Sequence, residues 1–133
     1  MSRPNTATLL LRCPDQKGLN AAIANLLVRH NINILDAQQH TDEEAGIFFH
    51  RVYFDVVGMA ASRDQLQKEL AEECARYGME WRLSFAEQKK RVAIFVSKYE
   101  HCIYDLLLRH KVGELNCDIP LIISNHEDLR YFA

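Results

Sequence analysis

The sequence predicts an α+β chain: a ferredoxin-like βαββαβ domain followed by an incomplete Rossmann-like βαβ unit of an α/β domain. Three observations lead to this prediction. Residues 1–86 alternate between strand-like and helix-like spacing of apolar side chains, in the order that the ferredoxin-like domain requires. Two later segments are apolar almost throughout, which is typical of strands buried on both faces of a parallel sheet. A short charged linker, 87–91, separates the first domain from the second unit, 92–133.

The first strand and the first helix are separated by a clearly marked turn. Residues 6–13 predict a strand, and Pro14 ends it because proline cannot continue a central ladder. Gly18 permits a positive φ in the turn. Residues 19–30 place their apolar side chains on one face of a helix. We expect this helix to stop at Asn31, since asparagine tolerates the left-handed conformation.

Two further strands follow, and the second has the clearest pattern in the chain. Residues 32–40 predict a weaker and more polar strand, and residues 41–46 predict a turn. Within 47–57 one face carries apolar side chains, with His50 among them: Phe48, Val52, Phe54 and Val56. The other face carries Phe49, Arg51, Tyr53 and Asp55. We expect the first face to meet a core and the second to be partly covered.

Two residues of this strand allow more than one interpretation. His50 lies among apolar neighbours, and we expect a hydrogen-bonded core histidine rather than a ligand. Arg51 lies beside Phe49 and Tyr53. It either contacts a partner sheet or is an exposed cross-strand charge, and the sequence leaves both open.

The remaining elements complete the first domain and open the second. A helix begins at the N-cap Ser62 and ends at Gly78, and a half-buried strand, 79–85, follows it. The second unit consists of an apolar strand, a helix and another apolar strand, at residues 92–96, 101–110 and 119–124. We expect its helix to face inward through Ile103, Leu106 and Leu107.

The second unit is too small to be complete. Two parallel strands and one helix leave a sheet face uncovered, and residues 92–133 bury too little surface to fold alone. The tail 127–133 predicts the first turns of another helix. We therefore expect the chain to end inside its second domain, as a truncated form, a proteolytic fragment or the ordered part of something longer.

Composition excludes several classes of protein. The chain is 48% hydrophobic and 26% charged, which is ordinary for a globular protein. Sixteen basic and eighteen acidic residues give a net charge of −2, which offers no electrostatic case for nucleic acid. No apolar run reaches the ~20 residues of a membrane crossing. The N-terminus lacks the apolar core of a signal peptide, so we expect a cytoplasmic protein.

The cysteines do not predict a metal site. Cys13, Cys74, Cys102 and Cys117 are too far apart for CxxC pairs, so we expect four reduced, mostly buried thiols. Cys102 follows His101, but adjacent helical residues point about 100° apart. We therefore expect a packed cysteine and a solvent-facing or capping histidine rather than a nucleophile with its base.

Two motifs of the first domain resemble those of the ACT domain, a small regulatory module that commonly binds amino acids. They are residues 14–19, Pro-Asp-Gln-Lys-Gly-Leu, and residues 31–36, Asn-Ile-Asn-Ile-Leu-Asp. The resemblance implies an effector site at Asp15, Gly18 and Asn33, where the helix N-terminus would meet a carboxylate and the aspartate an ammonium group. It implies glycine or methionine as the effector. A plain tight turn is the alternative, because many such modules only mediate assembly.

Four segments of the second unit resemble formyltetrahydrofolate deformylases: 91–98, 101–107, 113–115 and 119–126. The joined order of the two modules strengthens the resemblance. It implies hydrolysis of 10-formyltetrahydrofolate to formate and tetrahydrofolate, in one-carbon and purine metabolism, with no further cofactor. The family's catalytic domain resembles glycinamide ribonucleotide formyltransferase, and its asparagine, histidine and aspartate lie well downstream of Asn125. No catalytic residue is therefore expected in this chain, and neither Asn125 nor His126 has the spacing to replace them.

The turn after the first strand of the second unit departs from the transferase pattern. Transferases of that fold place a glycine-rich turn there, which holds the phosphate of the amine acceptor. Residues 97–101 contain no glycine and carry the carboxylate of Glu100, so water fits better as the acceptor. Because doubly wound sheets bind ligands at the carboxyl ends of their strands, we expect Ser97, Lys98 and His101 to border the substrate cleft. Lys98 either reaches the substrate or is a solvated lysine.

The sequence also leaves the assembly and the class of activity open. Ferredoxin-like sheets have exposed edges and one uncovered face, so we expect a homo-oligomer, either a dimer or a tetramer. One alternative is a non-enzymatic ACT protein that binds amino acids or mediates assembly. Another is a formyl transferase in place of a hydrolase.

Overall fold

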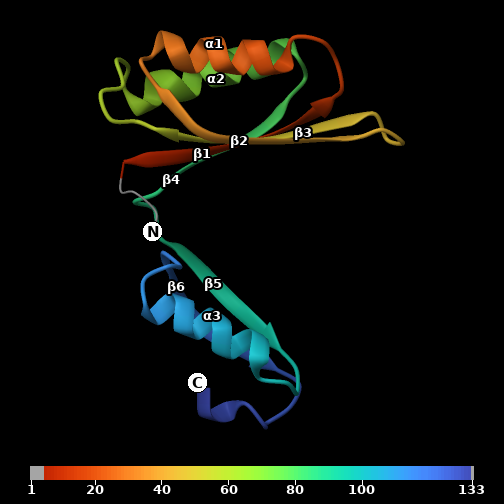
Figure 1. Ribbon diagram of the computed structural model, residues 1–133, viewed down its shortest axis with the longest axis vertical. Helices are drawn as coiled ribbons and strands as arrows, with labels where there is room; N and C mark the ends of the chain where they lie inside the picture. The colour runs from red at the N-terminus through yellow and green to blue at the C-terminus, as the bar shows by residue number, and fades with distance from the viewer. Residues whose placement is uncertain (1–4, 133) are drawn as a thin grey trace. The chain divides into compact units, whose positions relative to one another are not determined.

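The computed structural model describes residues 5–132, which form two compact units. The first unit ends at Ala86 and the second begins at Glu87. The elements in chain order are β1 (Thr6–Pro14), α1 (Leu19–Arg29), β2 (Asn33–Asp42), β3 (Ile47–Asp55), α2 (Arg63–Arg76), β4 (Glu80–Phe85), β5 (Lys90–Val96), α3 (His101–Lys111), β6 (Cys117–Ser124) and the 3-10 helix η1 (Arg130–Phe132) (Figure 1). No helix within the described residues is long and apolar enough to cross a membrane.

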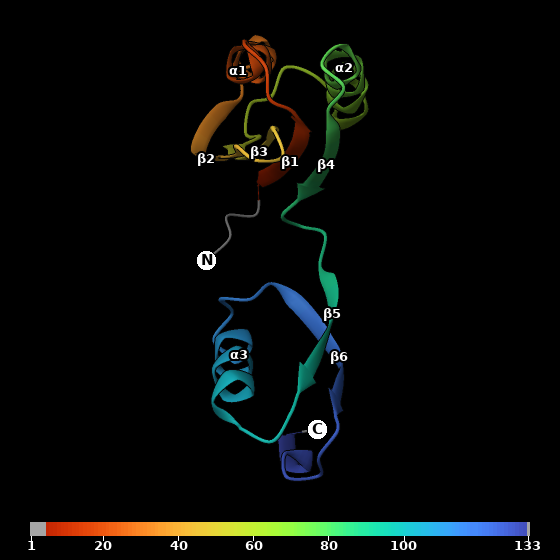
Figure 2. The same cartoon turned by 90° about the vertical axis from the view of Figure 1, so that its right-hand side faces the viewer.

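The first unit is a four-stranded antiparallel sheet in the order β2-β3-β1-β4. Helices α1 and α2 lie side by side on one of its faces (Figures 1 and 2). The predicted ferredoxin-like βαββαβ order is therefore confirmed. Between the sheet and the helices lies one hydrophobic core, whose most deeply buried side chains include Leu9, Ile23, Leu26, Leu27, Val52, Phe54, Leu66 and Leu70.

The turns and helix caps of the first unit lie at the residues where the sequence predicts them. Gly18 precedes α1 with a φ of 89°, and Asn31 follows that helix with a φ of 56°. The Ser62 hydroxyl accepts a hydrogen bond from the Gln65 backbone N–H at 3.2 Å, which caps α2 as predicted. Gly78 ends the same helix with a φ of 64°.

His50 differs from its expected environment. It is buried on the helix-facing side of β3, as predicted, beside the ring of Phe48. However, its Nδ1 atom has no hydrogen-bond partner within residues 5–132, so the expectation of a fully hydrogen-bonded histidine was wrong. Burial lowers the pKa of this imidazole, because the apolar surroundings disfavour the charged form.

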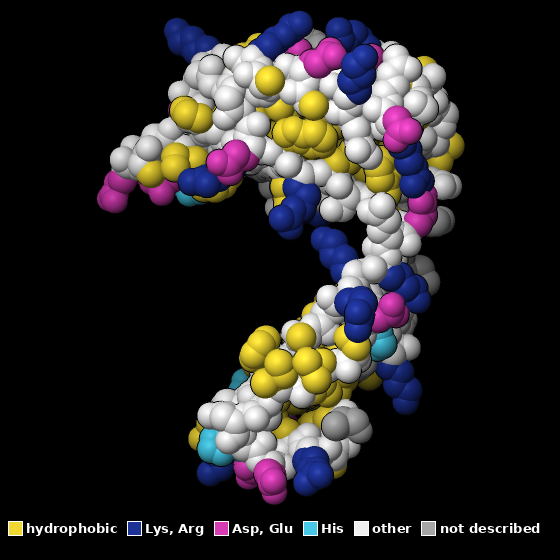
Figure 3. All heavy atoms as spheres, turned by 180° about the vertical axis from the view of Figure 1, so that it is seen from behind, with side chains coloured by type: hydrophobic (Ala, Val, Ile, Leu, Met, Phe, Trp, Pro, Cys, Tyr) yellow, Lys and Arg dark blue, Asp and Glu magenta, His cyan; other side chains and the backbone are white. Residues whose placement is uncertain are grey.

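The second unit pairs β5 and β6 in parallel, with α3 packed on one face through Ile94 and Ile103. The strand β5 starts at Lys90, so part of the expected linker is strand. The opposite face of this sheet is uncovered within the described residues, as two strands and one helix predict, and Phe95 on that face is 76% exposed. Figure 3 shows hydrophobic side chains gathered on a surface of this unit.

Two details of the second unit differ from the pattern that the sequence predicts. Leu106 is 37% exposed rather than inward-facing, whereas Ile103 is fully buried and Leu107 packs against the small core, as expected. Part of the tail forms η1, a 3-10 turn rather than the predicted α-helical turns. Leu129, before η1, packs against Ile94. Ala133 lies outside the described residues.

The four cysteines are free thiols, but they are not mostly buried. Cys13 and Cys74 lie in the core of the first unit, Cys117 is half-buried and Cys102 is exposed on α3. Burial raises the pKa of Cys74 to about 11, with smaller contributions from Glu73 and Cys13. Burial, followed by the charge of Asp15, also raises the pKa of Cys13.

A hydrogen bond between His30 and Glu69 joins the end of α1 to α2 in the first unit. The Nε2 atom of His30 lies 2.6 Å from a carboxylate oxygen of Glu69, and Gln65 donates a second hydrogen bond to this carboxylate at 3.3 Å. The hydrogen bond from His30, then that from Gln65, lowers the pKa of Glu69. A lowered folded-state pKa stabilises the native state above the carboxyl's unfolded pKa, and the stabilisation is lost as the pH falls through the folded-state pKa.

We expect Glu69→Gln to flatten the acid limb of the stability curve. In the original chain the melting temperature should fall steeply below about pH 5, where unfolded glutamate begins to bind protons. In Glu69→Gln this part of the slope should be missing. Thermal unfolding, followed by circular dichroism at intervals of about one pH unit between pH 3 and pH 7, measures this slope of the melting temperature. Glu72→Gln, on the exposed side of α2, is the control and should keep the original slope. Equal slopes in Glu69→Gln and the original chain would contradict the assignment.

Thiol reactivity should follow the observed exposure rather than the sequence expectation. In the native chain at pH 8, Cys102 should react first with a thiol reagent, Cys117 more slowly, and Cys13 and Cys74 only after unfolding, because thiolate character and access control the rate. The time course of a chromogenic disulfide reagent measures the phases. Cys102→Ser should remove the fast phase and Cys117→Ser should leave it; a fast phase that survives in Cys102→Ser would show that the exposed thiol was misassigned.

Candidate functional site

The turn between β1 and α1 is fixed by hydrogen bonds from two sides. The backbone N–H of Asp15 donates to the carbonyl of Gly46 at 2.9 Å, which ties the turn to the β2–β3 turn. The side-chain amide of Gln16 donates to the carbonyl of Tyr77 at 3.0 Å, at the end of α2. Gly18 can therefore hold its positive φ at the start of α1.

The positive end of the α1 helix dipole, at its N-terminus, is not offset by a capping or acidic side chain of the helix. No side chain caps Gly18, and the first turn of α1 contains no acidic residue. The first N–H groups of a helix have no intrahelical acceptor and carry the positive end of its dipole. This end of α1 therefore favours an anionic group such as a carboxylate.

A cavity of about 390 Å³ lies beside this helix end. It is lined by Asp15 and Gly18 from the turn, Asn20 from α1, Gln39 from β2 and Phe48 from β3, among others. Asn20 donates to the side-chain oxygen of Gln39 at 2.6 Å, which joins α1 to β2 at the cavity wall. The cavity thus combines a carboxylate, a helix N-terminus and an aromatic ring.

Asn33 does not join Asp15 and Gly18. It starts β2 and pairs with Asp55, whereas Thr41, which lines the cavity, pairs with Phe48 eight residues further along the strand. The helix α1 lies between the two places, and its 11 residues span about 16 Å. Residues before and after this helix therefore lie at opposite ends of the unit, and one copy does not bring Asn33 together with Asp15 and Gly18.

Sequence reasoning missed the strand residues that line the cavity. Gln39 and Thr41 belong to β2, whose polar sequence showed no clear alternation. The available signal was the pairing of β2 with β3, which puts Gln39 opposite His50 and on the same face as Phe48. That pairing depends on residues far apart in the sequence.

In the second unit, the turn after β5 is exposed. Ser97, Lys98 and His101 all face solvent within the described unit. Glu100, at the start of α3, accepts a hydrogen bond from the hydroxyl of Tyr131. This hydrogen bond is the largest cause of the raised pKa of Tyr131, because the anionic phenolate would lose it.

A second cavity, of about 340 Å³, lies at the carboxyl ends of β5 and β6. Val96, Ser124, His126 and Arg130 line it together with nearby residues, but none of Ser97, Lys98 and His101 does. The His126 backbone N–H donates to the Ser124 hydroxyl at 3.1 Å. The cavity therefore occupies the sheet edge that sequence reasoning selected, but is lined by the end of β6 and the tail.

The expected roles of His101 and Cys102 are only partly correct. His101 is exposed, as expected, but Cys102 is exposed as well rather than packed. No hydrogen bond joins the two within the described chain, so they do not form a nucleophile–base pair. Among residues 5–132, no group of three or more His, Cys, Asp or Glu side chains is placed to hold a metal ion.

Comparison with known proteins identifies the first unit. The model of the ACT domain family matches residues 7–75, which run from β1 through most of α2. The chain belongs to the ACT domain family.

Known proteins also match the chain across both units. It is 43% identical over 128 residues to a formyltetrahydrofolate deformylase of Synechocystis sp., covering 96% of this chain and 45% of that protein. It is 42% identical to the Bacillus subtilis formyltetrahydrofolate deformylase, covering 92% of this chain and 41% of that protein. The crystal structure of a deformylase from Pseudomonas syringae pv. tomato superposes with a TM-score of 0.80 at 37% identity, covering 96% and 43% of the two chains. The predicted resemblance is confirmed, and the chain spans less than half the length of these relatives.

Proposed function

We propose that the chain is the N-terminal, regulatory part of an enzyme that hydrolyses 10-formyltetrahydrofolate to formate and tetrahydrofolate. The observation that carries this proposal is the 43% identity over 128 residues, which runs through both the ACT unit and the parallel βαβ unit. Sequence identity confined to the ACT unit would support only a regulatory module. The order of the two units in one chain supports the hydrolase.

The catalytic residues of the proposed enzyme lie outside this chain. In support, His101 and Cys102 are not hydrogen-bonded to each other. Lys98 has an exposed side chain and no ion-pair partner within residues 5–132, so its ammonium group is available to an anionic substrate group. Ser97, Lys98 and His101 would border the cleft in the whole protein.

Water is proposed as the acceptor of the formyl group. The turn from Ser97 to His101 has no glycine, and its Glu100 carboxylate is occupied by the hydroxyl of Tyr131. A turn with side chains at each position and a carboxylate in it would repel the phosphate of an amine acceptor. The reaction therefore needs no acceptor beyond water, and no cofactor beyond its folate substrate.

The ACT unit is proposed to bind an amino-acid effector, glycine or methionine, beside Asp15 and Gly18. The uncapped end of α1 would receive the α-carboxylate, and the Asp15 carboxylate would receive the α-ammonium group. An aliphatic side chain would extend toward Phe48 in the 390 Å³ cavity. Asn33, at the other end of α1, would make no contact within the same copy.

The proposed enzyme is a homo-oligomer of the cytoplasm, either a dimer or a tetramer. Oligomerisation is supported by the sheet of the ACT unit, which has two exposed edge strands, β2 and β4, and one face without helices. The cytoplasm is supported by the free thiols of the described chain, which fit a reducing compartment.

Calorimetry on the 133-residue chain tests the effector site. We expect glycine or methionine to release or absorb heat on binding, and Asp15→Asn to weaken that binding about tenfold or more, the size of one charge-assisted contact. Asn33→Ala is the matched control and should bind as the original chain does. If Asn33→Ala loses binding and Asp15→Asn keeps it, the proposed site is wrong; if neither amino acid gives heat, the unit has no such effector.

Formate release tests the enzyme. The complete protein should liberate formate from 10-formyltetrahydrofolate, whereas the 133-residue chain alone should liberate none. In the complete protein, Lys98→Ala should lower kcat/KM about tenfold, because it removes one charge-assisted contact. Lys111→Ala, at the other end of α3, should leave kcat/KM unchanged. Turnover by the 133-residue chain would contradict the placement of the catalytic residues.

A further inference from the structure

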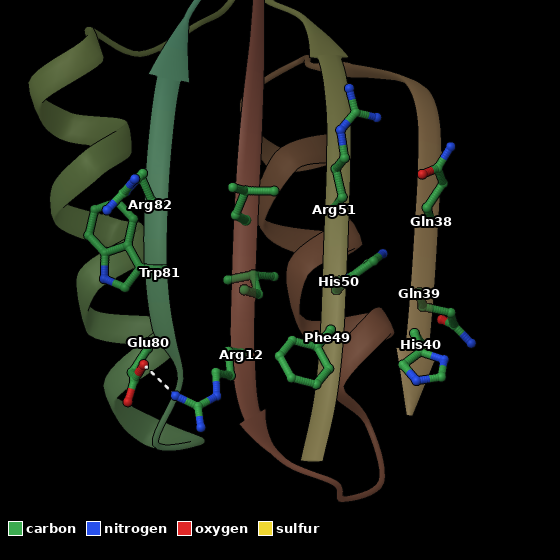
Figure 4. Close-up of a pocket in the computed structure, with 12 residues that line it drawn as sticks. Arg12, Gln38, Gln39, His40, Phe49, His50, Arg51, Glu80, Trp81 and Arg82 are labelled. Carbon is green, nitrogen blue, oxygen red and sulfur yellow. Dashed lines mark hydrogen bonds and ion pairs between the residues drawn. The ribbon is translucent and has the colours of Figure 1, made fainter. Parts of the chain in front are cut away.

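The sheet of the ACT unit has one face without helices, here called the open face: the outward-facing residues of β1, β2, β3 and β4. Figure 4 views this face with both helices behind the sheet. Strand pairing arranges its side chains in rows that cross all four strands. The middle row runs from Arg82 on β4 through Leu10 on β1 and Arg51 on β3 to Gln38 on β2.

The rows on either side have acidic residues at opposite ends. One row runs from Glu80 on β4 through Arg12 and Phe49 to His40 on β2. The other row ends on β2 with Asp36, which lies opposite Tyr53. The carboxylates of these two rows therefore lie on the two outer strands, while Asp55 and Asp42 lie near the ends of β3 and β2.

The centre of the open face is apolar and nearly flat. Leu10 is 44% exposed and Phe49 is 39% exposed, on adjacent strands, and the His40 ring stacks on Phe49 with 6.5 Å between ring centroids. The depression over them holds about 580 Å³ but is open to solvent. A small ligand needs a concave site that encloses most of its surface, so this face suits another protein surface better.

The charges of the open face are incompletely satisfied. Arg12 lies 3.4 Å from Glu80, and Arg51 lies 3.4 Å from Asp36, and both pairs are exposed. Arg82 has no ion-pair partner within the described residues, although it lies beside Leu10 in the middle row. A partner that presents a carboxylate opposite the β4 edge would complete the pairing.

We propose that the open face packs against the open face of a second copy, about a two-fold axis that runs parallel to the strands between β1 and β3. This arrangement rests on the proposed homo-oligomer and names its interface. Such an axis lays β4 of one copy over β2 of the other and keeps the rows aligned. Arg82 then lies over Gln38 of the second copy, one row from Asp36 and within reach of it by its long side chain, and the two-fold repeats this contact. Arg12 meets the ring of Phe49, and Glu80 meets His40.

Charge selects this axis over the other two-fold axis in the plane of the interface. An axis perpendicular to the strands would lay β4 on β4 and set Arg82 against Arg82 and Arg51 against Arg51. The parallel axis keeps Arg51 beside its own Asp36, whose carboxylate bridges to Arg82 of the second copy. Arg82 and Asp36 of the two copies then lie one row apart at both edges, and the exposed Leu10 and Phe49 are covered at the centre.

The size of the open face is sufficient for a reversible dimer. Four strands about 4.8 Å apart, of six to ten residues of about 3.3 Å each, give a projected area of roughly 540 Å² per copy. Stable complexes bury about 800 Å² of accessible surface per partner. The accessible area of the open face exceeds its projected area because side chains protrude from the sheet, so it approaches this value. The interface should therefore be of moderate affinity and sensitive to single charge reversals.

Two complementary charge reversals test the interface in the 133-residue chain. Arg82→Glu places two carboxylates together at each edge, and Asp36→Arg places two cations together, so each variant alone should dimerise at least tenfold more weakly. Mixed in equal amounts they should form a heterodimer, because both edge contacts then pair opposite charges. Sedimentation equilibrium of each variant and of the mixture measures this, and Lys68→Glu on α2 is the control that should dimerise like the original chain.

The outcomes separate the interface from self-association itself. Recovery of the dimer on mixing supports the face-to-face arrangement, since a misfolded variant would not be rescued by its complement. If both variants dimerise as well as the unsubstituted chain, the proposed interface is wrong. The chain would then still be a homo-oligomer, formed through strand edges. A mixture that stays monomeric overturns the interface too. An original chain that is monomeric at high micromolar concentration overturns both the interface and the homo-oligomer.

Discussion

The antiparallel pairing of β1 with β3 determines most of the first unit. These two strands lie at the centre of the sheet, and their register sets Leu9 opposite Val52 and Leu11 opposite His50 on the buried face. Because side chains alternate between faces, a slip of one residue would expose this set and bury Arg51. The same register that builds the core therefore also builds the row of charges on the open face.

The position of α1 on this sheet creates the cavity that we propose as a ligand site. The helix α1 begins directly after the turn at Gly18 and runs along the sheet, so its positive end comes to rest beside β2 and β3. The hydrogen bond between Asn20 and Gln39 holds it there. The direction of α1 also explains why Asn33 belongs to the opposite end of the unit, even though its motif predicted a shared site.

Local patterns predicted the fold well, and contacts between distant residues account for what they missed. Asn31 and Ser62 act through their own neighbours, and both were predicted correctly. Cys102 was expected to be packed because of its type, but an apolar side chain does not specify which element covers it, and Cys102 is exposed in the described unit. The cavity beside α1 needs the pairing of β2 with β3, which the polar sequence around Gln39 did not reveal.

The cavity beside α1, which is the proposed ligand site, and the open face share two strands. On β3, Phe48 lines the cavity and Phe49 lies on the open face; on β2, Gln39 lines the cavity and His40 stacks on Phe49. Successive strand residues point to opposite faces, so one peptide unit joins each pair. A ligand that fixes the position of Phe48 therefore also restricts Phe49 without contacting it. This geometry would couple the proposed effector binding on the helix side of the sheet to the proposed association on the other side, because both would depend on the backbone of the same two strands.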